Sequence, residues 1–106
     1  MDLFEKARYK EMAKISKALS HATRLYMVEK LKEKEYCLKE LTKMIGADNS
    51  TVSKHLTVLK NVGIISDEKR GNCVYFKLEC PCVLNIFSCV VNVIDSNTKR
   101  QNELSI

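Results

Sequence analysis

The side chains of this sequence that are best suited to chemistry are its cysteines. Cys80 and Cys82 stand on either side of a single proline, and Cys89 follows seven residues after Cys82. Thiolate sulfur is a soft ligand that suits ions such as As(III), Cd(II) and Zn(II). Cys80, Cys82 and Cys89 are therefore candidate ligands for a thiophilic metal or metalloid, with Cys37 as a further candidate.

The spacing of these cysteines limits how one ion can be bound. In a regular helix Cys82 and Cys89 would lie about two turns, or roughly 10 Å, apart. Metal–sulfur bonds of about 2.3 Å cannot span that distance. Three arrangements satisfy the constraint: the helix begins after Cys82, the helix bends, or Cys89 comes from a second subunit.

The rest of the sequence contains no recognisable catalytic set. There is no Ser/His/Asp set, no P-loop and no GxGxxG motif, and the only histidines are His21 and His55. A thiol oxidoreductase would favour Cys-x-x-Cys at a helix start, whereas this chain has Cys-Pro-Cys. These features argue against an enzyme.

Charge and hydropathy indicate where the chain works and what it meets. The N-terminus is charged and lacks the apolar core of a signal peptide. The longest apolar stretch, residues 83–94, is too short for a membrane span, which takes roughly 20 residues. We therefore expect a cytoplasmic protein without membrane contact, whose five cysteines are reduced. The net charge of +5 favours a polyanionic partner.

Residues 47–60 form the stretch around which the other elements are arranged. Asp48 is a good helix N-cap, and Val52, Leu56 and Leu59 recur at helical spacing, so they form an apolar stripe that faces a core. The opposite face carries short polar groups and one cation, which suit contacts with base edges and phosphates. These residues are Asn49, Ser50, Ser53, Lys54 and Thr57.

A shorter amphipathic helix precedes this stretch. Leu38, Leu41 and Ile45 form its stripe, and Gly46 ends it in the manner of a C-terminal capping glycine. A helix, a tight glycine turn and a polar-faced helix are together typical of a helix-turn-helix. An ordinary pair of packed helices is the alternative interpretation.

A β-hairpin is predicted after the helix-turn-helix. Residues 64–69 and 73–78 read as two strands joined by a turn, with alternating apolar side chains on the return strand. Lys69, Arg70 and Gly71 form the tip, and a basic hairpin in this place is typical of a wing, whose tip could reach phosphates or the minor groove. A surface hairpin with a tip that is basic by chance is the alternative interpretation. Cys73 falls on the polar side of the strand, and we assign it no role.

The two ends of the chain are expected to be helical. A first helix covers about residues 3–19, and a second carries Leu25, Val28 and Leu31. Residues 80–95 are predicted to form an almost wholly apolar last helix, with Pro81 in its first turn, although so many Val, Ile and Phe residues would also suit a strand. So small a chain has little room for that helix inside its own core, so we expect it at a subunit interface. Residues 96–106 are polar and are expected to fray.

Several segments resemble motifs of one family. Residues 18–25 (ALSHATRL) resemble the opening of the ArsR/SmtB family of winged-helix repressors, with Ala22 where proline is usual. Residues 50–60 (STVSKHLTVLK) are similar to its recognition element. Residues 63–65 and 71–78 are similar to its wing. The resemblance covers roughly residues 12–90, with the motifs in the expected order.

This resemblance implies one winged helix-turn-helix domain over residues 1–106, mainly α with a small β-hairpin wing. It implies a homodimer paired through the first and last helices, which binds a double-stranded operator and is released by an inducer. Carried over by position, the DNA contacts would be Asn49, Ser50, Ser53 and Lys54. His55 belongs to the same set, with packing against the wing or a bond to a backbone group as its alternative.

The resemblance also limits which cysteines could form the site that senses the inducer. The family's thiolate site at the start of the helix-turn-helix has two cysteines, whereas here Lys39 stands in the place of the second one after Cys37. Some family members carry three cysteines around the last helix and bind As(III), as Cys80, Cys82 and Cys89 would. Two alternatives stay open: a thiol redox switch, or cysteines that only fill space, with an organic inducer or none.

Overall fold

The computed structural model describes residues 1–104 of the chain. The order of elements is α1 (Leu3–Ala18), α2 (Ala22–Glu33), β1 (Tyr36–Cys37), α3 (Leu38–Ile45), α4 (Asn49–Asn61), β2 (Ile65–Arg70), β3 (Cys73–Leu78) and α5 (Val83–Leu104). This is a mainly helical winged helix-turn-helix, as the sequence predicted. Among the described helices, none is both long enough and apolar enough to cross a membrane.

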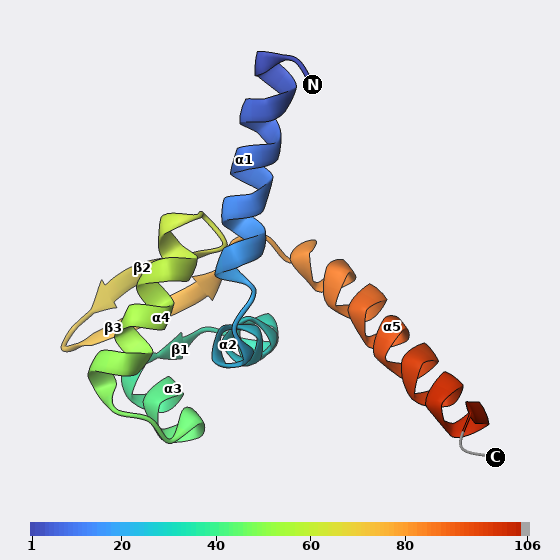
Figure 1. Cartoon of the computed structure of the whole chain (residues 1–106). Coiled ribbons are helices and arrows are strands. Elements are labelled where there is room, and N and C mark those ends of the chain that lie inside the picture. The colour runs from blue at the N-terminus through green and yellow to red at the C-terminus, as the bar shows by residue number, and fades with distance from the viewer. Residues whose placement is uncertain (105–106) are drawn as a thin grey trace.

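One core holds the central elements together. Buried side chains from α2, α3, α4 and the sheet pack into a single cluster, which also includes the first residue of α5. The most deeply buried members are Met27, Val28, Leu41, Val52, Leu56 and Leu59. Figure 1 shows that α1 and α5 extend away from this body in different directions.

The sheet has three antiparallel strands in the order β1-β3-β2. The β2–β3 hairpin pairs Ile65 with Leu78 at its base and Arg70 with Cys73 at its tip. The sequence predicted this wing, with its first strand placed one residue too early. It did not predict β1, where Tyr36 pairs with Phe76, because two residues are too few to show an alternating pattern.

The last helix differs from the prediction at both ends. Three successive backbone bonds of 3.1 Å, from the N–H groups of residues 83, 84 and 85 to the carbonyls of residues 80, 81 and 82, form a tight turn before α5. Cys80, Pro81 and Cys82 therefore precede the helix and are not its first turn. The sequence expected residues 96–106 to fray, whereas α5 continues to Leu104; residues 105–106 lie outside the described part of the chain.

The apolar face of α5 is not covered within one chain. Ile86, Val90, Val93 and Ile94 are each at least half exposed, and Val83 is the buried residue of the helix. The sequence placed this helix at a subunit interface.

Candidate nucleic-acid interface

The turn between α3 and α4 sets the angle of the two helices. Gly46 takes a left-handed conformation with φ of 79°, which residues with a side chain rarely adopt, and its N–H donates to the carbonyl of Thr42 at 2.9 Å. The chain can therefore leave α3 sharply and begin α4 only three residues later. This is the helix-turn-helix geometry that the sequence predicted.

Asp48 caps the first turn of α4. Its Oδ1 accepts from the Thr51 N–H at 2.7 Å and from the Ser50 hydroxyl at 2.8 Å. Because these donors stabilise the charged carboxylate, the backbone bond from Thr51 first, they lower the pKa of Asp48 to about 2. The start of the helix is therefore fixed by a group that stays ionised under all physiological conditions.

The two faces of α4 separate as predicted. Val52, Leu56 and Leu59 are buried in the core. The opposite face is exposed over all five residues that the sequence assigned to it: Asn49, Ser50, Ser53, Lys54 and Thr57. Of these, Ser50 is engaged with the cap, and the Thr57 hydroxyl donates to the Ser53 carbonyl at 2.9 Å. Lys54 forms no ion pair within residues 1–104.

His55 is placed differently from the other five residues. Its side chain is partly buried, and its Nδ1 lies 3.1 Å from Nη1 of Arg24. Its ring centroid is 4.3 Å from that of His21. Burial, followed by the charges of His21 and Arg24, lowers the pKa of His55. The structure thus brings His55 together with the start of α2 rather than with the exposed polar face.

The wing tip carries two cations in different states. Arg70 is paired with Glu35 at 2.9 Å and with Glu68 at 3.0 Å, and its guanidinium lies 4.9 Å from the centroid of the Tyr75 ring. Its hydrogen bonds to Glu68 and Glu35 raise the pKa of Arg70. Lys69 is exposed and forms no ion pair in the part of the chain described. Arg70 must therefore break its ion pairs with Glu35 and Glu68 before it can bind a phosphate.

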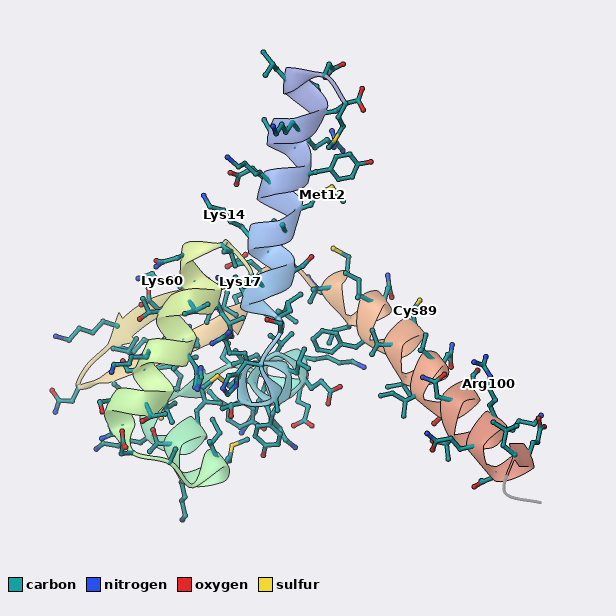
Figure 2. The ribbon with its side chains drawn as sticks, in the orientation of Figure 1. Met12, Lys14, Lys17, Lys60, Cys89 and Arg100 are labelled. Carbon is teal, nitrogen blue, oxygen red and sulfur yellow. The ribbon has the colours of Figure 1, made fainter. Side chains whose placement is uncertain are left out.

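The cysteines do not form a cluster within one chain. All five are free thiols; Cys82 and Cys89 are exposed, and Cys80 is half-buried with its sulfur 3.6 Å from the Gly63 carbonyl. Figure 2 shows Cys89 projecting outward from α5. Cys37 is buried just before α3, where its N–H donates to Glu40. Within residues 1–104 no three His, Cys, Asp or Glu side chains are grouped so as to hold a metal ion.

Comparison with known proteins identifies the family. The model of the "bacterial regulatory protein, arsR family" matches residues 21–67, which run from the start of α2 through the helix-turn-helix into the wing. This chain belongs to the ArsR family. The sequence resemblance is thereby confirmed, and the matched segment contains all the predicted contact residues on α4.

Curated ArsR-type relatives carry regulatory names. A "cadmium resistance transcriptional regulatory protein CadC homolog" of Staphylococcus aureus is 39% identical over 70 residues, which are 65% of this chain and 58% of that protein. CadC of Listeria innocua is 35% identical over 77 residues, 72% of this chain and 65% of that protein. The chain therefore matches less than two thirds of the length of these relatives.

Solved structures share the fold of this ArsR-family chain. The transcriptional repressor BigR of Xylella fastidiosa has a TM-score of 0.72 at 28% identity, with 88% of this chain and 96% of that chain covered. A homodimeric winged helix-turn-helix domain from Mycobacterium bovis has a TM-score of 0.79 at 23% identity, with 94% and 93% covered. The second likeness concerns the fold alone.

Proposed function

We propose that this ArsR-family protein is a homodimeric transcriptional repressor that binds a double-stranded DNA operator. The observation that carries the proposal is the exposed face of α4. Short polar groups stand there with Lys54, which has no ion-pair partner among residues 1–104, on a helix fixed to the core by its other face. A helix of this kind fits the major groove, with the wing beside it on the backbone or in the minor groove.

Exposed apolar surface supports the dimer. Phe4 and Met12 on α1, and Val90 and Ile94 on α5, are each at least half exposed in one chain. Helices that bury so little within their own domain gain stability by packing against a second copy. Such a dimer would present two α4 helices to successive major grooves, about one helical turn of DNA apart.

The proposed inducer is a thiophilic ion, with As(III), Cd(II) and Zn(II) as candidates. Cys80, Cys82 and Cys89 supply soft donors near the start of α5, and the relatives named for cadmium resistance support a metal signal. Because one chain does not group these thiols, the site would be completed by the second subunit. Cys37 is buried in the core and takes no part unless the fold opens.

Binding of the inducer would favour one arrangement of the two subunits. An ion held by the cysteines near the start of α5 would connect the turn at residues 80–82 to the helix that would line the interface. In the arrangement that suits the thiolate site, the spacing of the two α4 helices would no longer match that of successive major grooves, so the dimer would release DNA. Thiol oxidation at the exposed Cys82 and Cys89 would act at the same place, and it is the second candidate signal.

DNA binding is tested by selection. The full chain would be used to enrich duplexes from a random-sequence pool at pH 7.5, and the affinity of the enriched duplex compared with that of random duplex. We expect a partly palindromic sequence and much tighter binding than to random DNA. Failure to enrich any sequence would remove the proposed function.

The inducer is tested by ultraviolet titration of the reduced protein with As(III) and, separately, with Cd(II). We expect a stoichiometric sulfur-to-metal band that is lost in Cys89→Ser and kept in the matched control Cys73→Ser. The same ions should release the enriched duplex from the wild-type protein and from Cys73→Ser, but not from Cys89→Ser. No change in ultraviolet absorbance with either ion would exclude both as inducers. Thiol oxidation would then be the remaining candidate signal, and comparing the DNA affinities of the oxidised and reduced dimers would test it.

A further inference from the structure

Both histidines of the chain and one arginine meet where α1, α2 and α4 come together. His21 caps α2, and its Nδ1 accepts from the Thr23 N–H at 3.1 Å. Arg24, in the first turn of α2, reaches His55 on α4, with Nη1 and Nδ1 3.1 Å apart. The two histidine rings lie 4.3 Å apart. Nothing in the interface described above requires this cluster.

The geometry fixes the protonation of both rings. An arginine guanidinium has only donors and stays charged, so the Nδ1 of His55 must be the acceptor in the contact with Arg24. A backbone N–H is likewise only a donor, so the Nδ1 of His21 must carry a lone pair. Both contacts therefore exist only while the two imidazoles are neutral, with the proton on Nε2.

Protonation of this cluster would not be compensated. The ionisable groups that act on His55 are His21, the N-cap of α2, and Arg24 in its first turn, and each disfavours a charge on His55. From the side of α1 the cluster meets a carbonyl, that of Ala18. Arg24 forms no ion pair with an acid among residues 1–104. An added proton thus removes a hydrogen bond and places like charges side by side.

Arg24 also reaches the end of the first helix. Its Nε donates to the carbonyl of Ala18 at 2.6 Å, the last residue of α1, while the same guanidinium holds His55 on α4. One rigid, planar group therefore connects the helix proposed for dimerisation to the helix proposed for reading DNA. In a dimer, the position of α4 relative to its counterpart depends on this kind of connection.

We propose that Arg24 is a positioning residue that sets α4 against α1 through His55, and that operator binding weakens when His21 and His55 are protonated. The proposal rests on the proposed DNA-binding function. Its sign distinguishes it from a direct DNA contact by His55. A histidine that touches phosphate binds more tightly when it gains a positive charge, whereas a positioning link is lost.

The pH range of the effect follows from the composition. The chain has two histidines, both in the cluster, and carboxyl and thiol side chains ordinarily titrate below about 4.5 and above about 8. Because burial and the neighbouring charges lower the pKa of His55, the contribution of its neutral ring is complete above about pH 6.5 and is lost as the pH falls below it.

The test uses the duplex enriched by the wild-type protein at pH 7.5. Between pH 7.5 and 5.5 we expect its affinity to fall by about tenfold or more, about 1.4 kcal/mol or more. Affinity for random duplex should hold or rise. The double variant H21S/H55N keeps a cap and an acceptor but cannot titrate, so its affinity ratio between the two pH values should be near one. Unchanged or tighter specific binding by the wild type in acid would overturn the proposal.

A second variant separates position from charge. Arg24→Lys keeps the positive charge but lacks the fork that reaches Ala18 and His55 together, so specific binding at pH 7.5 should weaken several-fold while the dimer mass and unfolding midpoint stay close to wild type. The matched control is Arg8→Lys, on the exposed part of α1. Equal affinities for Arg24→Lys and wild type would contradict the proposal. Absence of any enriched duplex would end the proposed function and this inference with it, whereas binding without pH dependence overturns the inference alone.

Discussion

Lys54 offers the sharpest test of the DNA-facing surface, because it is exposed on α4 and no described carboxylate neutralises it. Each phosphate contact contributes about 0.9 to the slope of log affinity against log salt concentration. A dimer with one such contact per chain would lose about 1.8 from that slope in Lys54→Gln. The wild-type protein binds DNA more tightly than the variant at low salt. Over a fourfold rise in salt, from about 50 to 200 mM, the ratio of the two affinities should therefore fall by about tenfold.

The assay is a fluorescence-anisotropy titration of the enriched duplex at several salt concentrations. Lys99→Gln is the matched control, since it removes the same charge near the far end of α5, away from α4 in Figure 1. We expect its slope to equal that of the wild type. An unchanged slope in Lys54→Gln, or an equal loss in both variants, would refute the assignment of α4 to the phosphate-contacting surface.

Three further predictions concern the scaffold. Leu56→Ala removes a fully buried side chain from the core-facing side of α4 and should lower the free energy of unfolding by about 2 to 5 kcal/mol, whereas Leu104→Ala, at an exposed position, should change it by less than about 0.5; urea unfolding measures both. Ile94→Glu places a charge on the exposed apolar face of α5, so the dimer should dissociate in sedimentation equilibrium; a stable dimer would move the interface elsewhere. The depressed pKa of Asp48 means that its charged cap stabilises the fold above about pH 4 and is lost as the pH falls toward 2; the difference in unfolding midpoint between wild type and Asp48→Asn should disappear over that range and stay constant above it.

The sequence predicted α4 and the turn before it well because every signal there is local. The Asp48 cap, the apolar stripe through Leu56 and the left-handed Gly46 are each readable within one or two turns of chain. The wing was equally readable from the alternation of β3. Local patterns of this kind decide the element, and the tertiary contacts then agree with them.

Features that depend on distant partners were not predicted. The link from Arg24 to His55 joins residues 31 positions apart, and nothing in the spacing of either indicates the other. The end of α5 was placed too early because polar residues without proline or glycine continue a helix as readily as they form a tail. The arrangement of the thiols could not be read either, since the bounds of α5 decide where Cys80 and Cys82 lie.

The longest helices of the molecule are also its least supported ones. In a single chain α1 buries only Ala18 and α5 only Val83 among the described residues. Segments with so few buried contacts open with little free-energy cost, so a lone chain is an easy substrate for proteases. Pairing would protect these helices, which makes survival of the protein depend on its own concentration. A cell that produces too little of it would then lose the remainder faster, and the proposed repression would switch more steeply with protein level than DNA affinity alone implies.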